Sequence, residues 1–180
     1  MSLLFLGICI TSNAQESKYG FRIGANLSSI SSDDIVGELD ESRIGVVVGF
    51  FADYALTEKF RIQPELQYSE QGNDDKDLKV NYLQLPIMFK YDIFEFLNLQ
   101  LGPQVGVKIW EFEDNQPTIP DFATFDFAGV AGIGVNITDN FFVDFRYAFG
   151  ISDVFDQDGF DIGINDGNNR TFQLSIGYRL

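Results

Sequence analysis

The sequence predicts an all-β fold, an eight-stranded antiparallel up-and-down transmembrane β-barrel. Three observations support this: an apolar/polar alternation that recurs in eight segments, connections that alternate between short and long, and a polar face suited to a narrow interior. The stretch 60–68 alternates without a break, with apolar residues at every even position. Because successive side chains of a strand point to opposite faces, Arg61, Gln63 and Glu65 share the other face.

The same alternation recurs along the rest of the chain. In one of these segments Pro86 cannot donate a ladder hydrogen bond, so we expect a bulge or kink there. After the N-terminal segment there is no run of about 18 apolar residues, so a membrane-inserted form has to be a closed barrel. The further predicted strands cover 18–30, 43–55, 79–91, 97–110, 124–137, 141–152 and 170–180.

The connections between these segments alternate in length. An up-and-down membrane barrel produces this pattern, with short periplasmic turns at one rim and long extracellular loops at the other. Both chain ends then fall at the short-turn rim, where the first and last strands can pair and remove the sheet edges. The short turns are 57–59, 92–96 and 138–140, and the long connections are 31–42, 70–78, 111–123 and 153–169.

The two faces of the strands decide the environment of the barrel. A narrow eight-stranded lumen holds Gly, Asn, Gln and paired charges, whereas a soluble ligand-binding barrel would turn Leu, Phe and Val inward. The sequence therefore favours a lipid-facing apolar belt, and a soluble periplasmic barrel is the alternative. We expect interfacial aromatic girdles of Tyr19, Tyr54, Phe60, Tyr91, Phe141 and Tyr178 at the short-turn rim, and of Tyr68, Phe125 and Phe149 at the other.

Residues 1–15 are predicted to be a secretory signal peptide, and 16–180 the outer-membrane barrel domain. A short apolar core is followed by small residues at Ser12 and Ala14, which suits cleavage before Gln15. No basic residue precedes the core, which leaves open that the signal begins before Met1. Cys9 is the only cysteine and would leave with the signal, so the mature chain would have no disulfide and no cysteine metal site.

Three segments carry a family resemblance: Tyr-Gly-Phe-Arg-Ile-Gly-Ala-Asn-Leu at 19–27, Tyr-Leu-Gln-Leu-Pro-Ile-Met-Phe-Lys-Tyr at 82–91, and Phe-Gln-Leu-Ser-Ile-Gly-Tyr-Arg-Leu at 172–180. With them the chain resembles the PorT-type outer-membrane β-barrel family of Gram-negative bacteria, among the porin-family and OmpA-like eight-stranded barrels. The resemblance implies a bacterial outer-membrane location and envelope or secretion-machinery proteins as partners. It specifies a fold, and it transfers no activity.

Charged residues on the inward face are expected to form a structural ion network, because desolvated charges in a narrow lumen must pair. Lys108 and Asp126 are expected to pair near the long-loop rim. An acid–base role for Glu65 and Asp144 is the catalytic alternative, but the chain has no histidine to serve as the base of a triad. The predicted network contains Arg22, Arg61, Glu65, Lys90, Lys108, Asp126, Asp144, Arg146 and Arg179.

The charge of the chain limits its partners. A formal net charge of −15 argues against nucleic acid as a partner, because its phosphates would be repelled. The long connections carry most of the acidity, which suits divalent cations, although Val154 replaces the first ligand of the calcium-loop-like segment 156–159. We therefore expect a non-catalytic, cofactor-free protein in outer-membrane lipid, structural or adhesive or an envelope-assembly accessory. A small-solute channel is the alternative, and no oligomeric state follows from the sequence.

Overall fold

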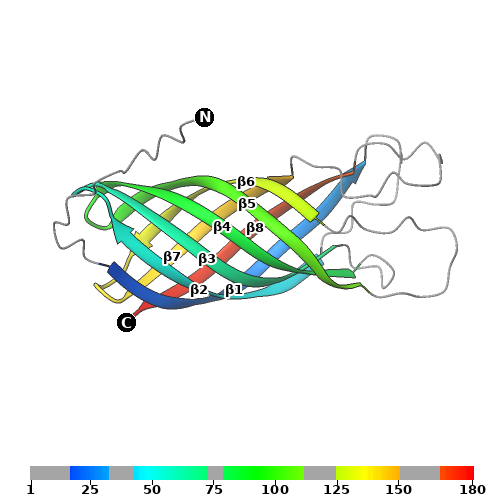
Figure 1. Ribbon diagram of the computed structural model, residues 1–180, viewed down its shortest axis with the longest axis horizontal. Helices are drawn as coiled ribbons and strands as arrows, with labels where there is room; N and C mark the ends of the chain where they lie inside the picture. The colour runs from blue at the N-terminus through cyan, green and yellow to red at the C-terminus, as the bar shows by residue number, and fades with distance from the viewer. Residues whose placement is uncertain (1–16, 33–42, 73–78, 112–124, 151–166) are drawn as a thin grey trace, which may run out of the picture.

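Eight strands form one closed antiparallel barrel in the computed structural model, which describes residues 17–32, 43–72, 79–111, 125–150 and 167–180. Each strand pairs with its neighbours in chain order, and β1 and β8 close the cylinder, so the predicted fold class is confirmed (Figure 1). The strands are β1 (Ser17–Ser32), β2 (Arg43–Ala55), β3 (Phe60–Gly72), β4 (Lys79–Phe94), β5 (Leu97–Glu111), β6 (Phe125–Asn136), β7 (Phe141–Gly150) and β8 (Gly167–Arg179).

The closing pair β1–β8 is a long antiparallel ladder. Its register runs from Gly20 opposite Arg179 to Ser32 opposite Gly167, and Leu180 adds a backbone hydrogen bond to Tyr19 O at 2.8 Å. The C-terminus therefore lies at the short-turn end of the barrel, at the left of Figure 1. Closure leaves no unpaired sheet edge, which is the condition for placing strands in lipid.

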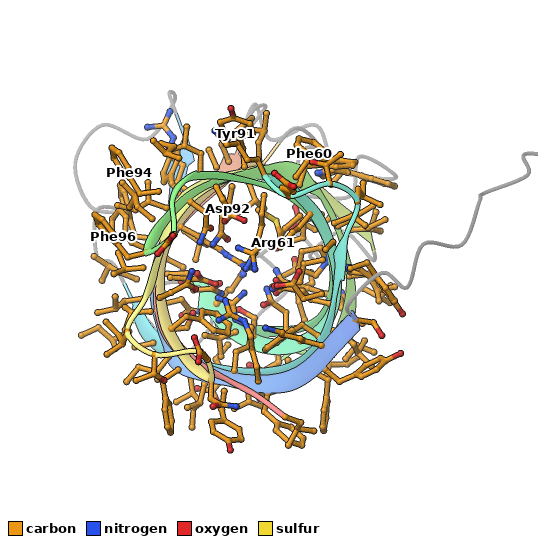
Figure 2. The ribbon with its side chains drawn as sticks, turned by 90° about the vertical axis from the view of Figure 1, so that its left-hand side faces the viewer. Phe60, Arg61, Tyr91, Asp92, Phe94 and Phe96 are labelled. Carbon is orange, nitrogen blue, oxygen red and sulfur yellow. The ribbon has the colours of Figure 1, made fainter. Side chains whose placement is uncertain are left out.

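Side chains divide sharply between the inside and the outside of the barrel. Apolar side chains such as Phe50 (60% exposed) and Leu85 (53% exposed) point outward, whereas Arg146 and Lys90 are buried in the lumen. Seen from the short-turn end, nitrogen- and oxygen-bearing side chains gather inside the ring of strands and carbon-rich ones radiate from it (Figure 2). This is the arrangement of a membrane barrel and the reverse of a soluble ligand-binding barrel.

Two of the short turns each contain a threonine at the equivalent position. In the β2–β3 turn, Thr57 Oγ1 accepts hydrogen bonds from the backbone N–H groups of Phe60 (3.0 Å) and Lys59 (3.3 Å). In the β6–β7 turn, Thr138 Oγ1 accepts the equivalent bonds from Phe141 (2.9 Å) and Asn140 (3.3 Å). A hydroxyl that binds backbone N–H groups fixes a turn locally, and both turns share the order apolar–Thr–acid–x–Phe.

The prediction of a bulge at Pro86 is wrong. Pro86 lies opposite Gln104 with no shift in register, and the shifts in the β4–β5 ladder fall instead between Asn81 and Tyr82 and between Asp92 and Phe94. In the β3–β4 ladder the register is likewise the same on both sides of Pro86. A proline only removes one donor, and losing a donor does not require an extra residue in the strand. Within the described ranges, no helix is long and apolar enough to cross a membrane.

Candidate functional site

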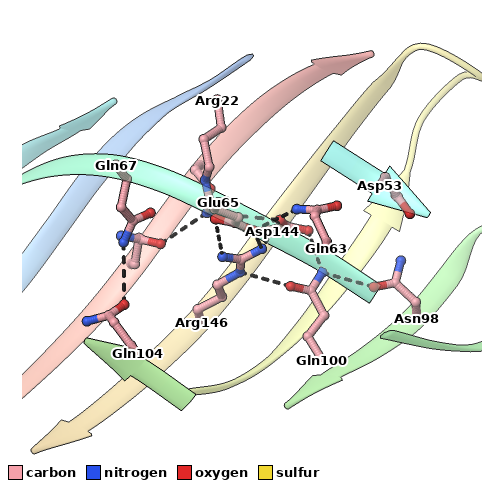
Figure 3. A network of polar contacts seen from close by, with 12 residues as sticks. Arg22, Asp53, Gln63, Glu65, Gln67, Asn98, Gln100, Gln104, Asp144 and Arg146 are labelled. Atoms are coloured by element: carbon pink, nitrogen blue, oxygen red, sulfur yellow. Dashed lines mark hydrogen bonds and ion pairs between the residues drawn. The ribbon is translucent and has the colours of Figure 1, made fainter. Parts of the chain in front are cut away.

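The barrel brings four charged residues from three strands into contact at the middle of the lumen. Arg22 comes from β1, Glu65 from β3, and Asp144 and Arg146 from β7. All four are at least 97% buried. We call these four residues the lumen ion cluster, and Figure 3 shows them with the amides around them (Figure 3).

Glu65 is the centre of the lumen ion cluster. Its Oε2 accepts hydrogen bonds from Arg22 Nη1 (2.6 Å) and Arg146 Nη1 (2.9 Å). Its Oε1 accepts from Arg146 Nη2 (2.8 Å) and Gln63 Nε2 (2.6 Å). The Arg146 contact is bidentate, the geometry in which a guanidinium binds a carboxylate most strongly.

Asp144 provides the second negative charge. Its Oδ2 lies 3.0 Å from Arg146 Nη2 and 4.0 Å from Arg22 Nη2, and its Oδ1 accepts a 2.7 Å hydrogen bond from Gln100. Gln100 Oε1 in turn accepts a 2.8 Å bond from Arg146 Nε. Two cations and two anions therefore neutralise each other, as enclosed charges must.

Neutral polar side chains accept hydrogen bonds from Arg22 Nη2, whereas Arg22 Nε has no hydrogen-bond partner among the described residues. Arg22 Nη2 donates to Gln173 Oε1 (3.0 Å) and also to the hydroxyl of Ser175, both on β8. Above this level, Gln67 donates to Gln84 at 2.9 Å, which continues the polar filling toward the long-loop rim. The lumen is thus lined by hydrogen-bonded side chains from several strands.

Glycines provide the space that these side chains occupy. A Cβ atom at Gly134 would lie 2.5 Å from Gln100 Nε2 and 2.7 Å from Asp144 Oδ1. At Gly177 it would collide with the ring of Phe142. Large inward residues on one strand therefore require glycine on its neighbour, which explains why the polar face is rich in both.

Below the lumen ion cluster, Phe142 lies between polar groups. The Arg179 guanidinium carbon is 4.5 Å from its ring centroid and the Lys90 ammonium is 5.0 Å away, and the Phe51 ring contacts it edge-on at 5.4 Å. Arg179 also donates to Asn136 Oδ1 at 2.8 Å. The ring face stabilises cations that burial has removed from water.

Arg61 closes the lumen near the short-turn end. It pairs with Asp53 at 3.0 Å and with Asp92 at 2.7 Å, which links β2, β3 and β4. Neither aspartate was among the residues expected from the sequence. Both lie at inward positions of their strands, so the alternation that identified Arg61 was also the signal that could have found them.

Lys108 and Asp126 are not brought into the lumen ion cluster. They face the lumen on the paired strands β5 and β6, where Gly106 lies opposite Asp126, and their mutual ion pair stays a prediction.

The signal peptide 1–15, the acidic long connections and the calcium-loop-like segment 156–159 lie outside the described residues. The side chain of Phe125, expected in the girdle at the long-loop rim, also lies outside the described part of the structure. Within the described ranges, no group of three or more Asp, Glu, Cys or His side chains is arranged to hold a metal ion.

Comparison with known proteins places this barrel among outer-membrane proteins. A family model described as "Outer membrane protein beta-barrel domain" matches residues 13–156. Among solved structures, the chain is similar to Ail, the attachment invasion locus protein of Yersinia pestis (TM-score 0.55, 18% identity, covering 92% of this chain and 99% of that one). No curated protein matches the chain.

Two further structures show the same fold. Neisserial surface protein A has a TM-score of 0.54 at 17% identity, and 92% of this chain covers 98% of that one. The N-terminal barrel domain of OprF from Pseudomonas aeruginosa has a TM-score of 0.52 at 14% identity, with coverages of 92% and 100%. At these identities the likeness shows the fold alone, and the outer-membrane family match sets the environment in which the lumen has to be interpreted.

Proposed function

Because the chain belongs to the family of outer membrane protein beta-barrel domains, we propose that it is a non-catalytic barrel with a closed lumen that displays acidic loops at the cell surface. Its role in this proposal is structural or adhesive, or that of an accessory in envelope assembly. The short turns, including 57–59 and 138–140, face the periplasm, and the long connections face outward.

The burial of the lumen ion cluster carries the proposal. Side chains that line a water-filled channel are accessible to water, whereas Arg146, Lys90 and Gln63 in the lumen of this barrel have less than 2% of their surface exposed. A solute would have to displace these mutually bonded side chains, and each buried charge separated from its partner is costly. This favours a barrel that displays loops at the cell surface over a channel that transports solutes.

The cluster also argues against catalysis. Both oxygens of Glu65 accept two hydrogen bonds each, from Arg22 and Arg146 at Oε2 and from Arg146 and Gln63 at Oε1. A general base needs a free lone pair within reach of a substrate proton. The pair Glu65 and Asp144 is therefore better explained as a structural element than as an acid–base pair.

Adhesion and envelope assembly are the two finer possibilities. Ail is by its name an attachment protein, and one of its structures contains a heparin analogue. The acidic connections of this chain would repel such a polyanion, so we propose cationic surfaces, or divalent cations bridging the loops, as the counterpart. A PorT-type role beside secretion-machinery proteins is the second possibility. Co-purification of such proteins from crosslinked envelopes would favour it over adhesion.

Conductance across a planar lipid bilayer tests the closed lumen. We expect the purified barrel to insert without discrete current steps above background, because the lumen ion cluster fills the bore. Glu65→Ala/Arg146→Ala is the matched variant: it removes one charge of each sign and shortens both side chains, and we expect it to show discrete current steps that the unaltered barrel lacks. Discrete steps in the unaltered barrel would contradict the proposal and support the small-solute channel.

A further inference from the structure

A groove lies at the short-turn rim, between the β2–β3 turn and the β4–β5 turn. It encloses about 540 Å³ and is lined by Glu58, Lys59, Asp92, Ile93, Phe94, Glu95 and Phe96. We call it the short-turn groove. It combines exposed apolar rings, one cation and several carboxylates at the rim of the barrel.

The apolar wall of the short-turn groove lies beyond the expected aromatic girdle. Phe94 and Phe96 stack with their ring centroids 5.6 Å apart and their planes at 7°, and they are 56% and 57% exposed. They come after Tyr91, which belongs to the expected girdle. Figure 2 places Tyr91, Phe94 and Phe96 outside the ring of strands, and Arg61 and Asp92 inside it. The groove therefore continues the lipid-facing surface toward the turns.

Both walls of the short-turn groove are fixed by hydrogen bonds. Asn136 holds the β4–β5 turn, because its backbone N–H donates to Phe96 O at 2.8 Å and its side-chain amide donates to Glu95 O at 2.9 Å. Thr57 caps the β2–β3 turn, and the backbone N–H of Asp92 donates to Lys59 O at 2.8 Å. A site held in this way loses little conformational freedom when a ligand binds.

We infer that the short-turn groove binds one phospholipid with an ethanolamine head group, from the leaflet at the short-turn rim. The acyl chains lie along Ile93, Phe94 and Phe96, and so continue the apolar belt. Lys59 binds the phosphate. The carboxylates of Glu58 and Glu95 accept hydrogen bonds from the ammonium group, and charge-assisted bonds of this kind are stronger than neutral ones.

Charge complementarity selects this lipid from others of the bilayer. Phosphatidylglycerol offers the same phosphate and acyl chains, but it has no cation for Glu58 and Glu95. Phosphatidylcholine has a cation that cannot donate an N–H hydrogen bond, although it can contact the aromatic rings. We therefore expect affinity to fall in the order ethanolamine, choline, glycerol. The inference relies on the proposed periplasmic position of this rim only for the choice of leaflet, since binding itself is measured on the isolated barrel.

Native mass spectrometry of the detergent-solubilised barrel tests the inference, with the palmitoyl-oleoyl form of each lipid as the probe. Because two carboxylates contact the ammonium group, we expect the first ethanolamine lipid to bind at least about tenfold more tightly than the glycerol lipid. Glu58→Gln/Glu95→Gln should bring the two affinities to within about threefold of each other. Phe94→Ala/Phe96→Ala should weaken binding of all three lipids by a similar factor.

Asp139→Asn is the matched control for Glu95→Gln, because each removes one exposed turn carboxylate and Asp139 lies in the β6–β7 turn, outside the short-turn groove. The control should keep the ethanolamine preference. Equal affinity for the ethanolamine and glycerol lipids, or the same loss in Glu95→Gln and Asp139→Asn, would overturn the inference. Each variant is first checked for heat-modifiable migration on a gel, which shows that the barrel is folded. Channel activity of the barrel would not alter the measured lipid affinities, so the closed-lumen proposal and the lipid-binding inference can fail independently of each other.

Discussion

Replacing Glu65 by glutamine removes the charge at the centre of the lumen ion cluster and changes little in volume. The carboxylate accepts bonds of 2.6 and 2.9 Å at Oε2 and of 2.6 and 2.8 Å at Oε1. The introduced amide has only one oxygen, so its NH₂ group faces donors that need an acceptor. Two arginines then share the single carboxylate of Asp144, and one buried positive charge has no counterpart.

The expected cost follows from this imbalance. Removing one partner of a buried ion pair typically destabilises a protein by about 3–5 kcal/mol, because the remaining charge stays buried without compensation. We expect a loss in this range for Glu65→Gln. The double variant Glu65→Gln/Arg146→Gln should recover part of it, since Arg22 and Asp144 then balance each other across the 4.0 Å contact.

Urea unfolding of the barrel in lipid vesicles measures this loss, with the shift of migration on unheated gels as the probe of folding. Glu70→Gln is the matched control on the same strand. Its carboxylate lies outside the lumen ion cluster and accepts longer bonds of 3.3 Å from Val46 N and from the Tyr68 hydroxyl, so we expect a cost below about 1 kcal/mol. If Glu65→Gln is no more destabilising than Glu70→Gln, the argument that enclosed charges must pair here is wrong.

Two further predictions test the faces and the ends of the barrel. Leu85→Arg places a charge on the outward face near the middle of β4, and it should lower the free energy of unfolding in vesicles by about 2–4 kcal/mol. Ile93→Arg, near the rim, is the control and should lower it by only about 0–1 kcal/mol. Equal small losses would mean that lipid does not cover this face. The mature chain is expected to lack cysteine, so a membrane-impermeant maleimide should leave the parent chain unlabelled. It should label Asp75→Cys on intact cells, and Asp139→Cys only after lysis. The reverse pattern would show that the proposed orientation is inverted.

The alternation of side chains determined how much of the fold could be predicted from sequence. Period two identifies a strand and its two faces, so the eight strands, their order and the inward position of Arg22 and Glu65 follow from the pattern alone. Strand ends are less certain, because an alternating pattern fades into turns gradually. β4, for example, continues to Phe94, three residues beyond the expected end.

Contacts across the lumen could not be predicted in the same way. Which inward residues meet depends on the stagger of the strands and on where glycine leaves room, and neither is visible in the alternation of one strand. Phe142 shows the difficulty. It stands beside Phe141 in an aromatic run that resembles the lipid belt, yet it points inward over Gly177 and contacts Arg179. Only its position in the strand, two residues before Asp144, would have placed it inside.

These contacts across the lumen explain why one register of the barrel is preferred. In lipid, the outer face gains little from a particular pairing of strands, because acyl chains are as apolar as the side chains they would replace. A slip of one residue in β1, however, would move Arg22 into the lipid and bring Phe21 or Ile23 beside Glu65. The lumen ion cluster joins β1 to β3 and β7, which are not all neighbours in the sheet. Only one closure of the barrel therefore satisfies all four charges, so the residues that we propose to fill the lumen also specify the fold.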